Sequence, residues 1–289
     1  MWFTETNTAQ IGAATTAGVI TQYTITAPSG FTCVVPQDII VGPDGNLWSA
    51  TFCGEAVSIT PSGHVTVYGL NGNASFTAIA VGPDKNLWLG DQNNGVIDVI
   101  TPAGSPVRTI TLPSNSVPTA IALGPDGNMW VANFGTSSID RVTTTGTVTA
   151  FASGIPTGDT VRGITAAPDG NLYFTAPSTE STVADNIGKI TTTGTITMLG
   201  SLTTNAAPVG ISADTQGNVW FREDTTGANA LGRVVTATGT VTEYALAGVT
   251  SPNVPDDGGG DISGNVIAGP GGNLWLGGSG VLYVAAPSS

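Results

Sequence analysis

A seven-residue motif that returns along the chain restricts the possible fold more than any other feature of the sequence. It reads GPDGNLW at residues 42–48. Five further copies follow: GPDKNLW (82–88), GPDGNMW (124–130), APDGNLY (167–173), DTQGNVW (214–220) and GPGGNLW (269–275). Together with Trp2, the aromatic residue of the motif marks seven positions that are 40 to 55 residues apart. Repeats of about 40 to 45 residues are typical of β-propellers, so the sequence predicts an all-β, seven-bladed β-propeller.

Each repeat contains four short segments with strand character, which we name A to D from the inside of the predicted propeller outwards. In the fourth repeat they are PTAIALG (118–124), NMWVAN (128–133), SIDRVTT (138–144) and TVTAF (147–151). Forty glycines and eighteen prolines supply residues for the turns between them. We predict a single domain, 1–289, with blade units at 1–23, 33–68, 76–112, 118–151, 161–199, 208–244 and 264–285.

The first and last units are incomplete. Residues 1–23 contain segments B, C and D, whereas residues 264–285 contain A, B and C. We therefore expect a first blade without its innermost strand and a last blade without its outermost strand. Met1 is followed at once by Trp2 with no basic segment, so no signal peptide is recognisable. The expectation is a chain cut from a longer precursor, or two ends that close against each other.

The recurring motif is interpreted as a turn and not as a metal or phosphate loop. Pro fits the first central position of a β-turn, Asp hydrogen-bonds the nearby backbone, and Gly adopts a positive φ. The aromatic residue then begins strand B and is expected to pack between blades. A calcium loop requires several carboxylates that converge on one ion, whereas most copies supply a single Asp after the Pro.

The charge of the chain excludes some classes of partner. Twenty acidic and seven basic residues give a net charge of −13. Because no Lys/Arg patch is available to neutralise phosphates, neither nucleic acid nor an anionic membrane is expected as a partner. No apolar run approaches the roughly 20 residues of a membrane span. Only 9% of residues are charged, so the fold should depend little on ion pairs and should tolerate acid. A monomer is expected.

The motif and the C–D hairpin that follows it together resemble the streptogramin B lyase (virginiamycin B lyase) family of seven-bladed propellers. The segments that carry the resemblance are MWFTETNTAQIGAATTAGVITQY (1–23), NLYFTAPSTESTVADNIGKITTTGTIT (171–197) and NVWFREDTTGANALGRVVTATGTVTEY (218–244). The resemblance covers nearly the whole chain. It implies an enzyme that opens a cyclic depsipeptide by elimination at its ester, assisted by Mg²⁺, on the face that bears the D–A and B–C loops.

The resemblance also implies where site residues should lie. Family histidines stand at the start of inner strands; the matching positions here are Gln37, Thr77, Thr119, Arg162, Val209 and Gly264, and none is histidine. The family carboxylate that follows the strand B aromatic residue is matched by Asp224, with Glu223 beside it. His64, the only histidine, lies in the PSGHVT turn between strands C and D and is expected to be exposed to solvent.

Two cysteines, Cys33 and Cys53, flank strands A and B of one blade and should emerge on the same loop-bearing face. They are expected to form a disulfide, which would indicate an oxidising compartment and so an extracellular or periplasmic protein. The alternative is two separate thiols. Metal binding by these cysteines is not expected, because no histidine is near them.

Two further features of the loop face are open to two interpretations each. Arg162 stands at the start of an inner strand and either binds a ligand carboxylate or forms an ion pair with Asp159. The segment SPNVPDDGGGDISGN (251–265) is the strongest interruption of the repeat. Its acidic residues Asp256, Asp257 and Asp261 either gather around a hard cation such as Ca²⁺ or form an acidic surface loop.

Three functions remain open from the sequence alone. The first is an exported propeller without the family's catalytic histidines that binds a small-molecule, peptide or glycan ligand. Its candidate ligand-binding residues are Gln37, Thr77, Asp91, Thr119, Asn133 and Arg162. The second is a lyase or hydrolase assisted by Mg²⁺ or Ca²⁺, with Asp224, Glu223 and Arg162 as candidate catalytic residues. The third is a rigid structural module of a larger surface protein.

Overall fold

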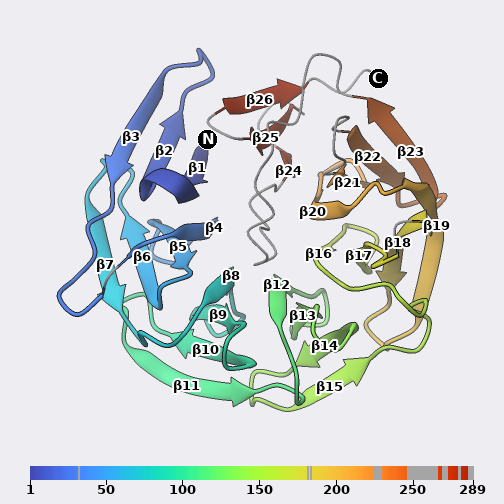
Figure 1. Ribbon diagram of the computed structural model, residues 1–289, viewed down its shortest axis with the longest axis horizontal. Helices are drawn as coiled ribbons and strands as arrows, with labels where there is room; N and C mark the ends of the chain where they lie inside the picture. Colours follow the sequence, from blue (N-terminus) through green and yellow to red (C-terminus); the bar gives the residue numbers. More distant parts are fainter. Residues whose placement is uncertain are drawn as a thin grey trace.

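The computed structural model describes residues 1–31, 33–180, 182, 184–223, 230–245, 266–268, 273–278 and 281–285. Over these residues the chain forms seven antiparallel sheets, five with four strands and two with three. The sheets follow one another around a central axis in chain order (Figure 1). The predicted all-β, seven-bladed propeller is confirmed.

The strands follow the repeat from blade to blade. The first two sheets contain β1 (Trp2–Glu5), β2 (Gln10–Ala14), β3 (Ile20–Thr24), and β4 (Pro36–Val41), β5 (Leu47–Thr51), β6 (Glu55–Ile59), β7 (Val65–Gly69). The next two contain β8 (Phe76–Val81), β9 (Leu87–Asp91), β10 (Val96–Ile100), β11 (Pro106–Thr111), and β12 (Pro118–Leu123), β13 (Met129–Asn133), β14 (Ser138–Val142), β15 (Val148–Phe151).

The second half of the chain continues the same order. The fifth and sixth sheets contain β16 (Ile164–Ala166), β17 (Leu172–Ala176), β18 (Ala184–Ile190), β19 (Ile196–Thr204), and β20 (Pro208–Ala213), β21 (Asn218–Glu223), β22 (Ala230–Val235), β23 (Thr240–Ala245). The last contains β24 (Val266–Ala268), β25 (Leu274–Gly278) and β26 (Val281–Ala285). The 3₁₀ turn η1 (Thr6–Thr8) lies between β1 and β2. No helix within the described ranges has the length and apolar character that a bilayer crossing requires.

Among the described residues, the first and the last sheet have three strands each, as the sequence predicts. The first sheet has the order β1-β2-β3, which corresponds to segments B, C and D. The last sheet has the order β24-β25-β26, which corresponds to segments A, B and C. Strand β1 packs beside β4 of the second sheet. The first blade therefore meets its neighbour through a B strand, whereas the later blades meet theirs through A strands.

The recurring aromatic residue packs each blade against the next. Trp48 on β5 is fully buried in a cluster with Phe76 and Ile79 of β8. Trp130 on β13 is likewise fully buried, in a cluster with Ile164 of the fifth sheet. Because a ring of this size buries about 150–250 Å², the motif supplies a large share of the contact between successive blades.

The turn before strand B holds this aromatic residue in place. Asp44 Oδ1 accepts hydrogen bonds from the Trp48 indole Nε1 (3.0 Å) and the Asn46 backbone N–H (3.2 Å). Gly45 has φ +81°. Gly42 leaves no room for a side chain, because a Cβ there would lie 2.3 Å from the indole ring. The motif is thus architectural, but its Asp has a second role that the sequence analysis missed, as the acceptor for the indole.

The same bond recurs in four later repeats. It joins Asp84 to Trp88, Asp126 to Trp130, Asp169 to the Tyr173 hydroxyl, and Asp214 to Trp220, at 2.9 to 3.0 Å. In DTQGNVW the Asp stands two positions earlier than in the other copies, yet its carboxylate reaches the indole. The sixth and last copy, GPGGNLW in the seventh blade, has no Asp, and Trp275 Nε1 is buried with no hydrogen-bond partner among the described residues.

Candidate functional site

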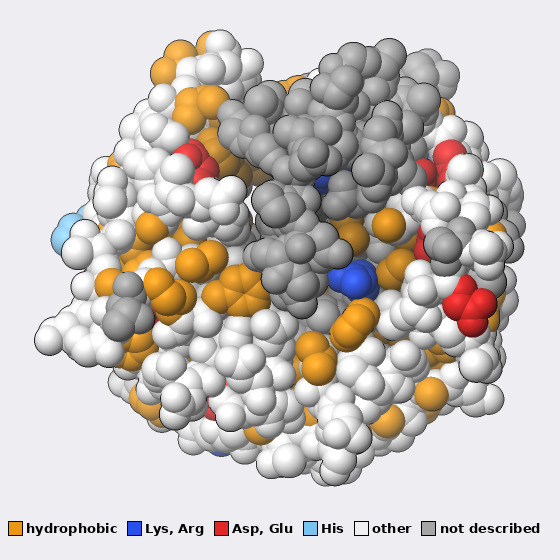
Figure 2. Space-filling model, viewed as in Figure 1, with side chains coloured by type: hydrophobic (Ala, Val, Ile, Leu, Met, Phe, Trp, Pro, Cys, Tyr) orange, Lys and Arg blue, Asp and Glu red, His pale blue; other side chains and the backbone are white. Residues whose placement is uncertain are grey.

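The loop face is the side of the propeller that carries the B–C turns and the D–A connections, where the inner strands begin. Figure 2 views the molecule from this side and shows apolar side chains around a basic side chain near the centre. The colour of histidine appears only at the edge of the view. This agrees with the place of His64 in the β6–β7 turn, where it is exposed.

Five of the six positions that correspond to the family histidines are among the described residues. Four of them are buried: Gln37, Thr77, Thr119 and Val209. The Thr77 hydroxyl donates to the Pro118 carbonyl (2.7 Å), and the Thr119 hydroxyl donates to the Arg162 carbonyl (2.7 Å). Both bonds connect an inner strand to the next blade. The sequence predicts these two threonines as ligand contacts. In the structure their hydroxyls instead form hydrogen bonds that connect neighbouring blades.

Asp91 and Asn133, two other predicted ligand contacts, end strands β9 and β13 and are fully buried. Asp91 Oδ1 accepts the backbone N–H of Ser75 (3.0 Å). Asn133 Oδ1 accepts the backbone N–H of Val117 (2.8 Å), and its Nδ2 donates to Asp140 Oδ2 (2.8 Å). Each side chain braces a B–C turn against the preceding D–A connection. Neither faces the open surface that a ligand would meet first.

Arg162 differs from its equivalents in the other inner strands because it is only half-buried. It precedes β16, and its backbone N–H donates to the Thr175 carbonyl (3.2 Å). The guanidinium carbon lies 4.8 Å from the centre of the Phe134 ring. This distance is within the range of a cation–π contact. Arg162 is thus a cation held against an aromatic ring on the loop face.

Four carboxylates meet near the junction of the fifth and sixth blades: Asp159, Asp185, Glu223 and Glu243. Glu223 is 2% exposed. Burial, together with the neighbouring Glu243 and Asp185 carboxylates, raises the pKa of the Glu223 carboxyl to about 8. Burial also raises the pKa of Asp159, with Asp185 adding to the effect. Asp159 Oδ2 accepts a hydrogen bond from Asn186 Nδ2 (2.7 Å).

The sequence analysis identified Glu223 but missed Asp185 and Glu243. Both have fixed hydrogen-bond partners: Asp185 accepts the backbone N–H groups of Ser178 (2.6 Å) and Ala207 (3.0 Å), and Glu243 accepts the backbone N–H of Thr203 (2.8 Å). No local spacing marks either residue: Glu243 reaches Glu223 through the pairing of β21, β22 and β23 within the sixth blade, and Asp185 comes from β18 of the fifth blade.

The resemblance implies a magnesium ion, and the described residues do not fit one. No group of three or more His, Cys, Asp or Glu side chains among them is arranged to hold a metal ion. The remaining predicted positions lie outside the described residues: Asp224, Asp256, Asp257, Asp261 and Gly264. We therefore derive no step through a metal.

A disulfide joins Cys33, in the connection before β4, to Cys53, in the turn after β5. Their Cα atoms are 6.0 Å apart, within the usual range for a disulfide. The pairing expected from the sequence is the one that the structure contains. The bond ties a D–A connection to a B–C turn on the loop face of the second blade.

Comparison with known proteins agrees with this architecture. The model of the virginiamycin B lyase family matches residues 1–105 and 34–276. The chain is similar to selenomethionine-substituted virginiamycin B lyase from Staphylococcus aureus, with 26% identity and a TM-score of 0.80 over 96% of this chain and 87% of the other. No curated protein matches the chain at a significant level.

Two further solved structures are similar to the chain. One is a catalytically inactive histidine-to-alanine variant of virginiamycin B lyase from Staphylococcus aureus with quinupristin, at 26% identity and a TM-score of 0.82 over 98% of this chain and 89% of the other. The other is hydrazine synthase from Kuenenia stuttgartiensis, at 17% identity and a TM-score of 0.70 over 90% and 79%. The second likeness concerns the fold alone, since one fold serves many functions.

Proposed function

The chain belongs to the virginiamycin B lyase family, and from that premise we propose that it binds a ligand on its loop face and lacks the family's histidine-dependent reaction. The ligand is a peptide-like small molecule that presents a carboxylate or carbonyl acceptor to Arg162. The disulfide between Cys33 and Cys53 supports an extracellular or periplasmic location, because such bonds persist in oxidising compartments.

The observation that carries the proposal is the position of the single histidine. The relative solved with quinupristin is inactive after one histidine was changed to alanine. In this chain His64 is exposed in the β6–β7 turn, at the opposite end of the strands from the loop face, and its backbone N–H donates to Thr60 Oγ1. A general acid or base must lie within hydrogen-bond reach of the proton it transfers. His64 is therefore no substitute for a histidine at an inner-strand start.

The chemistry of the ligand follows from Arg162 and its surroundings. A guanidinium presents a planar fork of N–H donors whose geometry matches the two oxygens of a carboxylate. Phe134 and the apolar side chains around the centre of the face (Figure 2) offer surface to a hydrophobic ligand body. Quinupristin is the first probe to use, because an inactive relative was solved with it.

The test mixes the protein with quinupristin and Mg²⁺ and follows the sample by chromatography with fragmentation mass spectrometry, because elimination leaves the mass unchanged. We expect binding, measured by calorimetry, and no ring opening. Arg162→Ala should weaken binding tenfold or more, which corresponds to about 1.4 kcal/mol. The matched control is Lys85→Gly, which removes the same charge from an exposed turn at the other end of the strands. Lys85 already has φ +61°, which Gly adopts readily.

Three results would contradict this proposal. Ring opening by the unaltered protein would show that the reaction persists without an inner-strand histidine. Absence of quinupristin binding would contradict the proposal that the ligand is a peptide-like molecule. Equal binding by the Arg162→Ala variant and the Lys85→Gly control would take Arg162 out of the ligand site. Circular dichroism on the same samples establishes that each variant is folded.

The second candidate function is a lyase or hydrolase that uses the Glu223 carboxylic acid as a proton donor. It is favoured by the buried carboxyl, which holds a proton at neutral pH, at the end of β21 beside the position of the family carboxylate. Its signature is turnover that Glu223→Gln abolishes and that a chelator also stops. Turnover retained by Glu223→Gln would exclude this role.

A further inference from the structure

One contact recurs where the outermost strand of a blade meets the C–D turn of the next blade. A large side chain of the strand lies against a glycine of that turn. The five contacts join Tyr23 to Gly63, Tyr68 to Gly104, Ile110 to Gly146, Phe151 to Gly194, and Leu199 to Gly239. All five glycines have a positive φ, between 73° and 94°. Because glycine has no side chain, the large side chain of the preceding blade can lie directly on the turn.

The first blade has the same turn between β2 and β3, but the glycine in it is uncovered. The Gly18 N–H donates to the Thr15 carbonyl (3.0 Å), and the Thr15 N–H donates to the Val19 carbonyl (2.9 Å). The corresponding two bonds close the turn at Gly146. Gly18 has φ +80°, yet no atom of the described residues lies within 4 Å of the position that a Cβ would take. Gly18 is exposed to solvent, whereas the covered turn glycines are half-buried.

The two residues that follow Gly18 are apolar and exposed. Val19 is 60% exposed and Ile20 is 52% exposed. The positions that match Val19 in the later turns are polar: His64, Ser105, Thr147, Thr195 and Thr240. We refer to Gly18, Val19 and Ile20 as the Gly18 patch. The first blade thus exposes an apolar patch where the later turns are polar and their glycines are covered.

The outer edge of β26 lies at the same boundary between blades. β26 pairs with β25 and with no other described strand, whereas the third strand of every four-stranded sheet also pairs with an outermost fourth strand. Val284 on β26 is 50% exposed. The last sheet lies beside the first around the axis (Figure 1). In each of the five contacts the strand belongs to the blade that precedes the glycine, so a strand that covered Gly18 would pair with β26.

The described outermost strands indicate what kind of segment fits this place. Five of the six contain an isoleucine or valine, a threonine, any residue, and then a tyrosine, phenylalanine or leucine: ITQY (20–23), VTVY (65–68), VTAF (148–151), ITML (196–199) and VTEY (241–244). The sequence contains no sixth copy of this pattern, and these five already pair within their own sheets. Neither this chain nor a second copy of it therefore has such a segment to spare.

We propose that the outer edge of β26 and the Gly18 patch together bind an extended segment of a partner protein. The segment pairs antiparallel with β26 and contains a β-branched residue, a threonine, any residue and then an aromatic residue. Backbone hydrogen bonds of the added strand supply affinity, as in other cases where a peptide extends a sheet edge. The aromatic ring lies on Gly18, as Tyr68 lies on Gly104. Val19 and Ile20 bury apolar surface against the segment.

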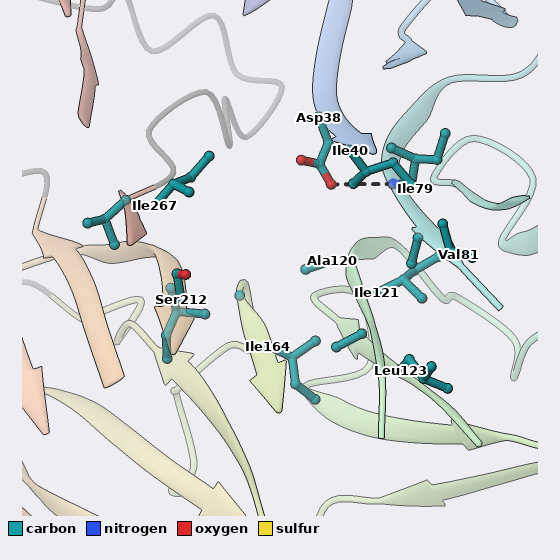
Figure 3. A pocket seen from close by; sticks show the side chains of 15 residues that line it. Asp38, Ile40, Ile79, Val81, Ala120, Ile121, Leu123, Ile164, Ser212 and Ile267 are labelled. Atoms are coloured by element: carbon teal, nitrogen blue, oxygen red, sulfur yellow. Dashed lines mark hydrogen bonds between the residues drawn. The ribbon is translucent and has the colours of Figure 1, made fainter. Parts of the chain in front are cut away.

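This binding surface is separate from the loop face and from the interior of the ring. The C–D turns lie at the end of the strands opposite the loop face. A cavity surrounded by the inner strands β4, β8, β12, β16, β20 and β24 (Figure 3) has neither the Gly18 patch nor a residue of β26 in its described lining. The segment therefore does not compete with a ligand at Arg162, and quinupristin should leave its affinity unchanged.

The probe is the peptide GHVTVYGL, which has the sequence of residues 63–70, labelled with fluorescein at its N-terminus. Its binding to the whole chain is measured by fluorescence anisotropy. We expect saturable binding that Tyr68→Ala in the peptide weakens tenfold or more, because the ring over Gly18 is lost. Thr66→Pro in the peptide should also weaken binding tenfold or more, since proline interrupts the pairing of strands. Equal binding by the parent peptide and the Tyr68→Ala peptide, or no saturable binding, would overturn the proposal.

Gly18→Asn tests the contact from the side of the protein. Asparagine tolerates a positive φ and places a side chain where the ring would lie. This variant should weaken binding of the parent peptide tenfold or more and remove most of its advantage over the Tyr68→Ala peptide. The matched control is Gly45→Asn, in an exposed turn with φ +81° and open space around the Cβ position, and it should leave binding unchanged. Circular dichroism establishes that both variants are folded. Binding unaffected by Gly18→Asn would overturn the proposal, because the peptide would then lie elsewhere.

Discussion

At the scale of single residues, the repeated Asp of the motif is the clearest case of a side chain with two functions. Asp126 shapes its turn through the backbone N–H and side-chain amide of Asn128, and it also accepts the Trp130 indole N–H. Burial alone would raise the pKa of Asp126, but the hydrogen bonds from Trp130 and Asn128 lower it. The ionised carboxylate thus belongs to the folded state, and it fixes the ring that packs against the next blade.

We expect Asp126→Ala to destabilise the protein by roughly 2 kcal/mol, because it removes charge-assisted hydrogen bonds and leaves the Trp130 indole N–H buried without its acceptor. Asp126→Asn keeps an oxygen acceptor and should cost less. The measurement is chemical unfolding followed by circular dichroism. Equal stability of the alanine variant and the parent would show that the indole bond contributes nothing net.

At the scale of strands, one type of hydrogen bond recurs between successive blades. It joins a side chain on one of the two inner strands of a blade to a backbone group of the next blade. Hydroxyls donate across four boundaries: Thr4 to the Gln37 carbonyl, Thr77 to that of Pro118, Thr119 to that of Arg162, and Thr175 to that of Val209. Between the second and third blades the hydrogen bond runs in the opposite direction, because the Asp38 side chain accepts the backbone N–H of Ile79. Two of the four hydroxyls, those of Thr77 and Thr119, belong to residues at the starts of inner strands.

Thr77→Val should lower stability by about 1–2 kcal/mol, since valine keeps the shape of threonine and leaves the buried Pro118 carbonyl without its donor. The control is Thr144→Val in the exposed β14–β15 turn, which should stay within about 0.5 kcal/mol of the parent. Urea unfolding midpoints of the two variants give the comparison. If both variants unfold at the same urea concentration, the inter-blade bond has no net stabilising effect.

The sequence predicts the blades well and the site poorly, for identifiable physical reasons. The turn motif and the four strand patterns are local, so the spacing of Trp48, Trp88 and Trp130 is enough to predict the sheets. The acid group around Glu223 combines strand pairing within the sixth blade, which brings Glu243, with packing against the fifth blade, which brings Asp185, so no local sequence pattern encodes it. The burial of Asp91 likewise depends on the D–A connection before β8, whose last residue, Ser75, lies 16 residues earlier in the chain.

At the scale of the whole molecule, the ionisable groups fall into two sets with opposite effects on stability. Burial raises the pKa of six carboxyl groups: Asp38, Glu55, Asp98, Asp140, Asp159 and Glu223. In three motif carboxyls hydrogen bonds outweigh burial and lower the pKa: Asp84, Asp126 and Asp214. A raised pKa stabilises the fold at low pH and loses this contribution as pH rises; a lowered pKa does the reverse.

The melting temperature should therefore rise as the pH falls from about 8 to about 5, because Glu223 and Asp38, with pKa values near 8 and 6, take up protons more readily in the folded state. Below about pH 4 it should fall again, as Asp84, Asp126 and Asp214 are protonated. Calorimetric melts between pH 3 and 9 test this. Glu223→Gln should flatten the curve between pH 6 and 8, and a melting temperature that drops steadily from pH 7 to pH 5 would contradict the prediction.

The indole in each motif also has an optical consequence. Six of the seven blades contain a tryptophan at the same structural position, and the fifth contains Tyr173. Indole emission shifts to longer wavelength when the indole is exposed to water. The fluorescence of each tryptophan therefore reports on the opening of its own blade. Replacing the tryptophans singly by phenylalanine would assign each part of the spectrum to a blade. The order in which those parts shift in denaturant would then show where the ring opens first.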